Sequence, residues 1–153
     1  MWLQAMSISR LRSVFRIFSG TEPTSEEQSQ LYKEVALMIL SRATSADSNI
    51  NQLEVEKVRD VLKVRTGEDF SDSDIRVVAQ STIFESAPLE RYIRSTARKL
   101  KPEDRLSIAR GLAEVIEADD RVTEREVTFF NNVAQELELT PAQLIGLESK
   151  ARV

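Results

Sequence analysis

An acidic turn that occurs twice is the feature that most limits how this chain can fold. The stretch ADSNINQLEVEKV (residues 46–58) returns in looser form as ADDRVTEREVTFF (residues 118–130), 72 residues later. The matched pairs at this spacing are Leu40 with Leu112, Asp47 with Asp119, Ile50 with Val122, Glu54 with Glu126 and Val61 with Val133. After a shift of three residues, FSDSDI also aligns with LTPAQL. The repeated unit is therefore a helix, an acidic turn, a second helix and a short capped helix. Two copies are too few for a solenoid, so the repeat favours a compact pseudo-symmetric bundle.

Helical periodicity continues outside the repeat, and no segment shows the alternation of a strand. We expect helices at residues 25–44, 51–64, from Ser71, from near Pro88 to 100, at 102–117, at 123–137 and from Thr140. Capping residues at Ser71 and Thr140, and prolines at early helical positions, favour these starts. In the second of these helices we expect Leu53, Val58, Val61 and Leu62 to be buried. The sequence thus predicts an all-α fold: a compact pseudo-symmetric helical bundle of about seven helices plus an N-terminal amphipathic helix.

Residues 1–24 differ in composition from the rest, so we divide the chain into an amphipathic N-terminal segment and linker (1–24) and a helical domain (25–153). The first twenty residues carry Arg10, Arg12 and Arg16 and no acid. At helical spacing Phe15 and Phe18 share a face with other apolar residues, opposite the arginines. This segment has three possible interpretations: a helix that docks on the domain, a helix that binds a membrane surface or a partner, and an organelle-targeting segment.

The absence of cysteine and histidine decides which chemistry is available. It excludes disulfides, zinc sites built on thiolate or imidazole, cysteine nucleophiles and the Ser-His-Asp triad. The remaining oxygen ligands suit hard divalent cations, namely calcium, magnesium or manganese. A net charge of −4 argues against general nucleic-acid binding.

The two acidic turns can be interpreted in two ways. Asn51 with Glu54, and Thr123 with Glu126, each fit a capping box, which explains both glutamates structurally. A capping box does not explain an aspartate seven residues before each glutamate. A divalent-cation site does, and its candidate ligands are Asp47, Asn49, Asn51, Glu54, Asp119, Asp120 and Glu126. Neither turn is an EF-hand, and each alone offers fewer oxygens than the six to eight that calcium prefers, so a shared site would need both turns close together.

These turns resemble those of the tellurite-resistance TerB-like family, whose pattern is Ala-Asp-Gly-x-Ile-(Ser/Thr)-x-x-Glu. The chain keeps Ala46, Asp47, Ile50 and Glu54 in the first copy and Ala118, Asp119, Val122, Thr123 and Glu126 in the second. Ser48 and Asp120 replace the glycine, which leaves a turn feasible but stiffer. The similarity covers roughly residues 28–148. It implies an all-α fold whose acids line a divalent-cation site, in a bacterial cytoplasmic protein linked to tellurite resistance, stress response and membrane-associated complexes. It implies no enzyme activity.

A second polar feature is the basic face of the predicted helix that begins near Pro88. Arg91, Arg94, Arg98 and Lys101 lie opposite its apolar stripe, either as an ordinary solvated face or as a docking patch for an anionic partner.

Three functions follow from these features. The first is a non-enzymatic, cation-binding interaction module with a protein partner, either in the cytoplasm or associated with a membrane. The second is a metal-free scaffold or adaptor domain, tethered to a membrane or a complex through the N-terminal helix. The third is a metal-dependent hydrolase, for which the sequence offers carboxylates but no recognisable nucleophile or phosphate-binding loop.

Overall fold

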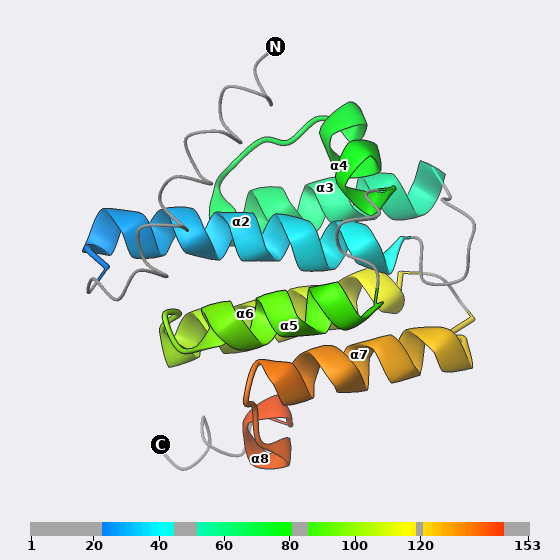
Figure 1. Ribbon diagram of the computed structural model, residues 1–153. Coiled ribbons are helices and arrows are strands. Elements are labelled where there is room, and N and C mark those ends of the chain that lie inside the picture. Colours follow the sequence, from blue (N-terminus) through cyan, green and yellow to red (C-terminus); the bar gives the residue numbers. More distant parts are fainter. Residues whose placement is uncertain (1–22, 45–51, 81–85, 119–120, 146–153) are drawn as a thin grey trace.

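Every element that the structure describes is a helix, which confirms the all-α prediction. The computed structural model describes residues 23–44, 52–80, 86–118 and 121–145. The helices are α2 (Ser25–Ala43), α3 (Gln52–Thr66), α4 (Asp72–Ala79), α5 (Ser86–Ala97), α6 (Pro102–Ile116), α7 (Glu124–Glu136) and α8 (Pro141–Leu144) (Figure 1). The predicted N-terminal helix and the predicted cap of α3 at Asn51 lie outside the described residues.

Four of these helices begin at a hydroxyl side chain that closes a capping box. The caps are Thr24 of α2, Ser71 of α4, Thr123 of α7 and Thr140 of α8. In each box the hydroxyl accepts a hydrogen bond from the third helical N–H, and the side chain at that position accepts one from the N–H of the cap. α6 instead begins with Pro102 in its first turn, where a missing N–H costs nothing. The predicted caps at Ser71, Thr123 and Thr140 are therefore confirmed.

The repeat of the sequence is also a repeat of the structure. α2, α3 and α4 form the first copy, and α6, α7 and α8 form the second. Leu40 and Leu112 are both fully buried, as are Val61 and Val133. α4 packs on α2 in the first copy as α8 packs on α6 in the second. α2 and α6 pack against each other, so one hydrophobic core serves both copies.

One predicted core residue is wrong: Leu53 is 73% exposed. The buried stripe of α3 is formed by Val55, Val58, Val61 and Leu62. Leu53 precedes Val55 by two residues, which turns it about 200° away from that position on a helix of 3.6 residues per turn. The stripe therefore begins two residues later than predicted, at Val55.

A partly buried polar cluster joins the two copies at the contact of α2, α3 and α6. The Tyr32 hydroxyl lies 3.0 Å from the Arg65 carbonyl, to which it donates, and 2.8 Å from the Ser107 hydroxyl. The Arg65 guanidinium donates to both carboxylate oxygens of Glu114, at 3.1 and 3.0 Å. α6 comes close to α3 here because Gly111 has no side chain: a Cβ would lie 3.1 Å from Val61 Cγ1.

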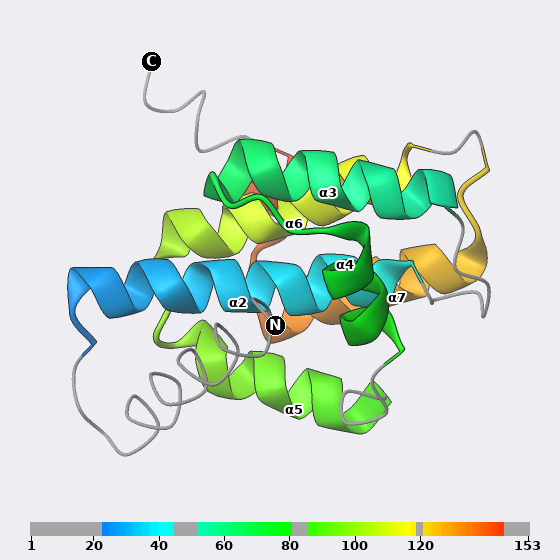
Figure 2. The ribbon, with the colours of Figure 1, turned by 90° about the horizontal axis from the view of Figure 1, so that it is seen from above.

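α5 lies outside the repeat and packs against α7 and α2. Its predicted apolar stripe is confirmed, since Leu89, Ile93 and Ala97 are buried, as is Leu100 just beyond the helix end. Figures 1 and 2 both show α3 and α5 on opposite sides of α2. The outward surface of α5 is thus well separated from that of α3.

Candidate metal centre

Two of the seven predicted cation ligands, Glu54 and Glu126, are among the residues that the structure describes. The other five lie outside them: Asp47, Asn49, Asn51, Asp119 and Asp120. Within the described residues, the two glutamates and the helix ends that flank the turns define the geometry of the predicted site.

The helix ends that flank the two acidic turns lie at the same end of the bundle. α2 ends at Ala43 and α3 begins at Gln52, while α6 ends at Ile116 and α7 begins at Glu124. Both views place these four ends together at one end of the molecule (Figures 1 and 2). This common end follows from the packing of α2 on α6 and of α3 on α6. The two segments that carry the predicted ligands are both attached there.

Glu126 is a buried carboxylate, 7% exposed, in the first turn of α7. Its Oε1 accepts hydrogen bonds from the Thr123 N–H at 2.9 Å and from the Thr123 hydroxyl at 3.2 Å. Its own N–H donates to the Thr123 hydroxyl at 3.1 Å. All of its side-chain hydrogen bonds with described residues end on Oε1. Oε2 therefore accepts no hydrogen bond from a described residue.

Glu54 occupies the corresponding place in the first copy, in the first turn of α3. It is half-buried, and like Glu126 it lies where the helix macrodipole stabilises negative charge. The repeat therefore places one glutamate carboxylate in the first turn of each of the equivalent helices α3 and α7. These starts flank the turns that hold the remaining predicted ligands.

The described residues alone do not complete a metal site. Among them, no group of three or more acidic side chains is close enough to hold an ion. Two carboxylates fall short of the six oxygens that magnesium and calcium need at minimum. A cation site at this end would need oxygens from residues 45–51 and 119–120.

An apolar hollow beside the second acidic turn was missed by the sequence analysis. It measures about 220 Å³ and is lined by Ala113, Ile116, Glu117, Val122, Val127 and Phe130. Val122 and Val127 are both roughly half exposed at its edge. The hollow brings apolar side chains within a few residues of Asp119 and Asp120.

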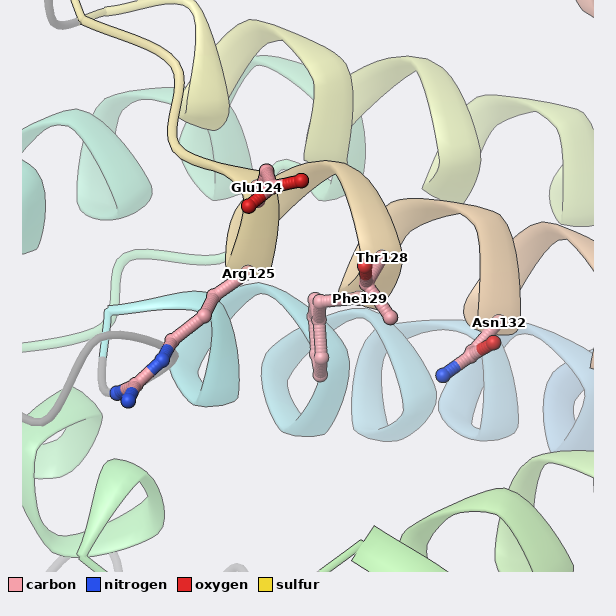
Figure 3. A pocket seen from close by; sticks show the side chains of 5 residues that line it. All are labelled: Glu124, Arg125, Thr128, Phe129 and Asn132. Carbon is pink, nitrogen blue, oxygen red and sulfur yellow. The ribbon is translucent and has the colours of Figure 1, made fainter.

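A second, more polar groove of about 420 Å³ runs along α7, lined by Glu124, Arg125, Thr128, Phe129 and Asn132. Figure 3 shows Arg125, Phe129 and Asn132 pointing to the same side of the helix. The spacing of the apolar residues on α7 could have indicated these two hollows. Val127 and Phe129 are two residues apart and therefore lie on different faces of the helix. One face cannot bury both of them together with Phe130 and Val133. Part of the apolar surface of α7 therefore had to remain outside the core.

The fold and these helix starts define a class: an all-α bundle of two repeats, each with an acidic turn that leads into a glutamate-bearing helix. A family model described as tellurite resistance protein TerB matches residues 33–149. The chain therefore belongs to the TerB family, as its turns indicated. Searches among curated proteins and solved structures give no significant match. None of the described helices is both long and apolar enough to cross a membrane.

Proposed function

We propose that this TerB family member is a non-enzymatic interaction module that binds a divalent cation through its two acidic turns. The observation that carries this proposal is Glu126, a buried carboxylate whose cap uses Oε1, while Oε2 accepts no hydrogen bond from a described residue. The family membership supports it, because the family resemblance rests on these same acids. The process we propose is bacterial tellurite resistance or stress response, in the cytoplasm.

The donor set fits a hard cation. Asp47, Asn49, Asn51 and Glu54 would contribute oxygens from the first turn, and Asp119, Asp120 and Glu126 from the second. Calcium, magnesium and manganese all accept carboxylate and amide oxygens, and the chain has no histidine or cysteine to favour zinc or copper. A bound cation would supply positive charge that offsets the repulsion between these acids and would link the two turns.

The proposed partner is another protein, and the second turn would transmit the cation signal to it. The apolar hollow between α6 and α7 begins at Ile116 and Glu117, just before residues 119–120, and continues at Val122, just after them. A change in the conformation of this turn would alter the shape of the hollow directly. Cation binding would in this way change the shape of a surface to which a partner protein binds.

Tellurite itself is not the proposed reactant. Thiols are the side chains that would reduce such an oxyanion, and this chain has none. A binding or scaffolding role in resistance therefore fits the residues better than direct reduction.

Calorimetric titration of the chelator-treated protein with calcium, magnesium and manganese tests the proposal. We expect saturable binding of at least one cation by the wild type and its loss in Asp47→Asn/Asp119→Asn. The matched control is Asp60→Asn/Asp69→Asn, which removes the same charge from two exposed aspartates outside the turns and should titrate like the wild type. Wild-type protein that binds none of the three cations would overturn the cation module and favour the metal-free adaptor, tethered through residues 1–24.

A further inference from the structure

The first residue of α3 is tied to α4 through its side chain. Gln52 Nε2 donates to Asp72 Oδ2 at 2.9 Å, and Gln52 Oε1 accepts a hydrogen bond from the Arg76 guanidinium. Within α3, Nε2 also donates to Glu56 at 3.2 Å, and Arg59 donates to the other oxygen of Asp72 at 3.1 Å. The Gln52 amide thus uses both its donor and its acceptor on charged side chains of α4, where hydrogen bonds are stronger than between neutral groups.

The second copy of the repeat does not reproduce this link. At the spacing of 72, the residue equivalent to Gln52 is Glu124, whose exposed side chain forms no hydrogen bond or ion pair with a described residue. α4 packs against both α2 and α3, whereas its counterpart α8 packs against α6 and lies near the end of α7, away from its start (Figure 1). The repeat therefore extends to the glutamates at these helix starts but not to the link with the short helix.

The link matters because the start of a helix opens more readily than its middle. The first N–H groups of a helix have no acceptor within it, so the first turn frays at little cost in free energy. Glu54 lies in this first turn, two residues after Gln52, and its carboxylate is fixed in space only while the turn is formed. Hydrogen bonds from Gln52 to α4 favour the formed turn and so reduce the ordering that ligand binding requires.

We infer that Gln52 is a positioning residue for the proposed cation site: it holds the start of α3 against α4 and thereby keeps Glu54 in place. This role rests on the proposed function, in which Glu54 binds the cation. It also makes the two copies unequal, because a second helix holds the start of α3 while α7 begins at its own cap, Thr123. The cation binds more tightly when fewer molecules have a frayed start of α3.

Calorimetric titration of Gln52→Ala with calcium, magnesium and manganese tests this role. Gln52 is uncharged, so the substitution leaves the net charge near the cation unchanged. We expect the affinity for the cation that the wild type binds to fall by about two- to fivefold, the equivalent of roughly one exposed hydrogen bond. The midpoint of urea unfolding without a cation should stay close to that of the wild type, because Gln52 is exposed.

The matched control is Gln135→Ala, the same replacement at an exposed position near the end of α7, where the glutamine side chain forms no hydrogen bond with a described residue. This variant should bind the cation like the wild type. Amide hydrogen exchange measures the start of α3 without any cation. In Gln52→Ala the amides of Glu56 and Lys57 should exchange faster than in the wild type, while those of α7 should not change.

These measurements distinguish a failure of the positioning role from a failure of the cation module. If the wild type binds a cation and Gln52→Ala binds it equally well, the positioning role is wrong and the cation module stands. If the wild type binds none of the three cations, both are wrong. An equal loss of affinity in Gln135→Ala, or unchanged exchange at the start of α3 in Gln52→Ala, would also overturn the positioning role.

Discussion

Among the described residues, hydrogen bonds reach only one oxygen of the Glu126 carboxylate. Oε1 receives both hydrogen bonds from Thr123, and Oε2 receives none from a described residue. A capping box and a cation ligand are therefore compatible at this residue. The two interpretations of the duplicated glutamates need not exclude each other, and substitutions can separate them.

Substitutions at Thr123 and Glu126 should affect different properties. Thr123→Ala removes the cap hydroxyl and should lower the free energy of unfolding by about 1 kcal/mol, while cation affinity stays close to that of the wild type. Glu126→Gln keeps an oxygen that can accept from the Thr123 N–H but loses the charge. It should weaken cation binding by about tenfold or more, with a smaller loss of stability than Thr123→Ala in the absence of the cation. Urea unfolding and calorimetry on both variants measure the two effects. Equal cation affinity in Glu126→Gln and the wild type would contradict a ligand role for Glu126.

Gly67 ends α3 in a conformation that favours glycine. Its φ is 78°, and its N–H donates to the Lys63 carbonyl at 2.9 Å. A Cβ at this position would meet no atom within 4 Å, so the penalty for a side chain comes from the backbone alone. Gly67→Ala should therefore cost about 1 kcal/mol in urea unfolding, and Gly67→Asn should cost less because asparagine tolerates this region. A neutral Gly67→Ala would show that the turn after α3 relaxes to another conformation.

The helix boundaries could be predicted where their cause is local. Ser71, Thr123, Thr140 and Pro102 mark helix starts through their own side chains, and the structure keeps each of them. The exposure of Leu53 could not be predicted in this way. The first turn of α3 is part of the same periodic pattern, but where the covered stripe begins depends on how α3 lies against α2 and α4.

The ion pair between α3 and α6 should make stability depend on pH. The pKa of Glu114 is lowered below its ordinary range. The largest cause is the hydrogen bonding from Arg65, and the positive charge of Arg65 adds to it. A lowered folded-state pKa means that this contribution is present above the pKa of the unfolded chain and is lost as the pH falls through the folded-state pKa. Because Glu114 is half exposed, solvent screening limits the contribution to a few tenths of a kcal/mol.

Glu114→Gln should accordingly reduce the difference in the free energy of unfolding between pH 7 and pH 3 by that amount. Urea unfolding at both pH values measures it. Glu117→Gln, which changes an exposed glutamate at the end of the same helix, serves as the control. If Glu114→Gln and Glu117→Gln show the same pH dependence, the pair with Arg65 does not contribute to stability.

The arrangement of the whole bundle explains why the candidate site was only partly predictable. The glutamates could be assigned to helix starts because a capping box involves only four consecutive residues and is visible in the local sequence. The position of both turns at one end of the bundle depends on the packing of α2 and α3 against α6, which brings together residues about 70 positions apart in the chain. The hollow at Val122 and Val127 likewise forms only because the core covers another face of α7.

A shared core predicts that the two repeats unfold together. Leu40 and Leu112 occupy equivalent places on α2 and α6, both fully buried in the cluster that joins the copies. Leu40→Ala and Leu112→Ala should each lower the free energy of unfolding by about 2–5 kcal/mol, because each removes the same buried groups and leaves a cavity. Val64→Ala, at a position that is 84% exposed, should change it by less than about 0.5 kcal/mol.

Urea unfolding should follow one transition in all three variants, with the same midpoint by far-UV circular dichroism and by tyrosine fluorescence. Tyr32 reports on the contact between the copies, through its bonds to Arg65 and Ser107, and Tyr92 reports on α5. Separate midpoints for the two signals would mean that part of the bundle unfolds independently. A leucine that costs far less than its equivalent would mean that one copy repacks around the cavity, and that the symmetry of the sequence does not extend to the energetics of the core.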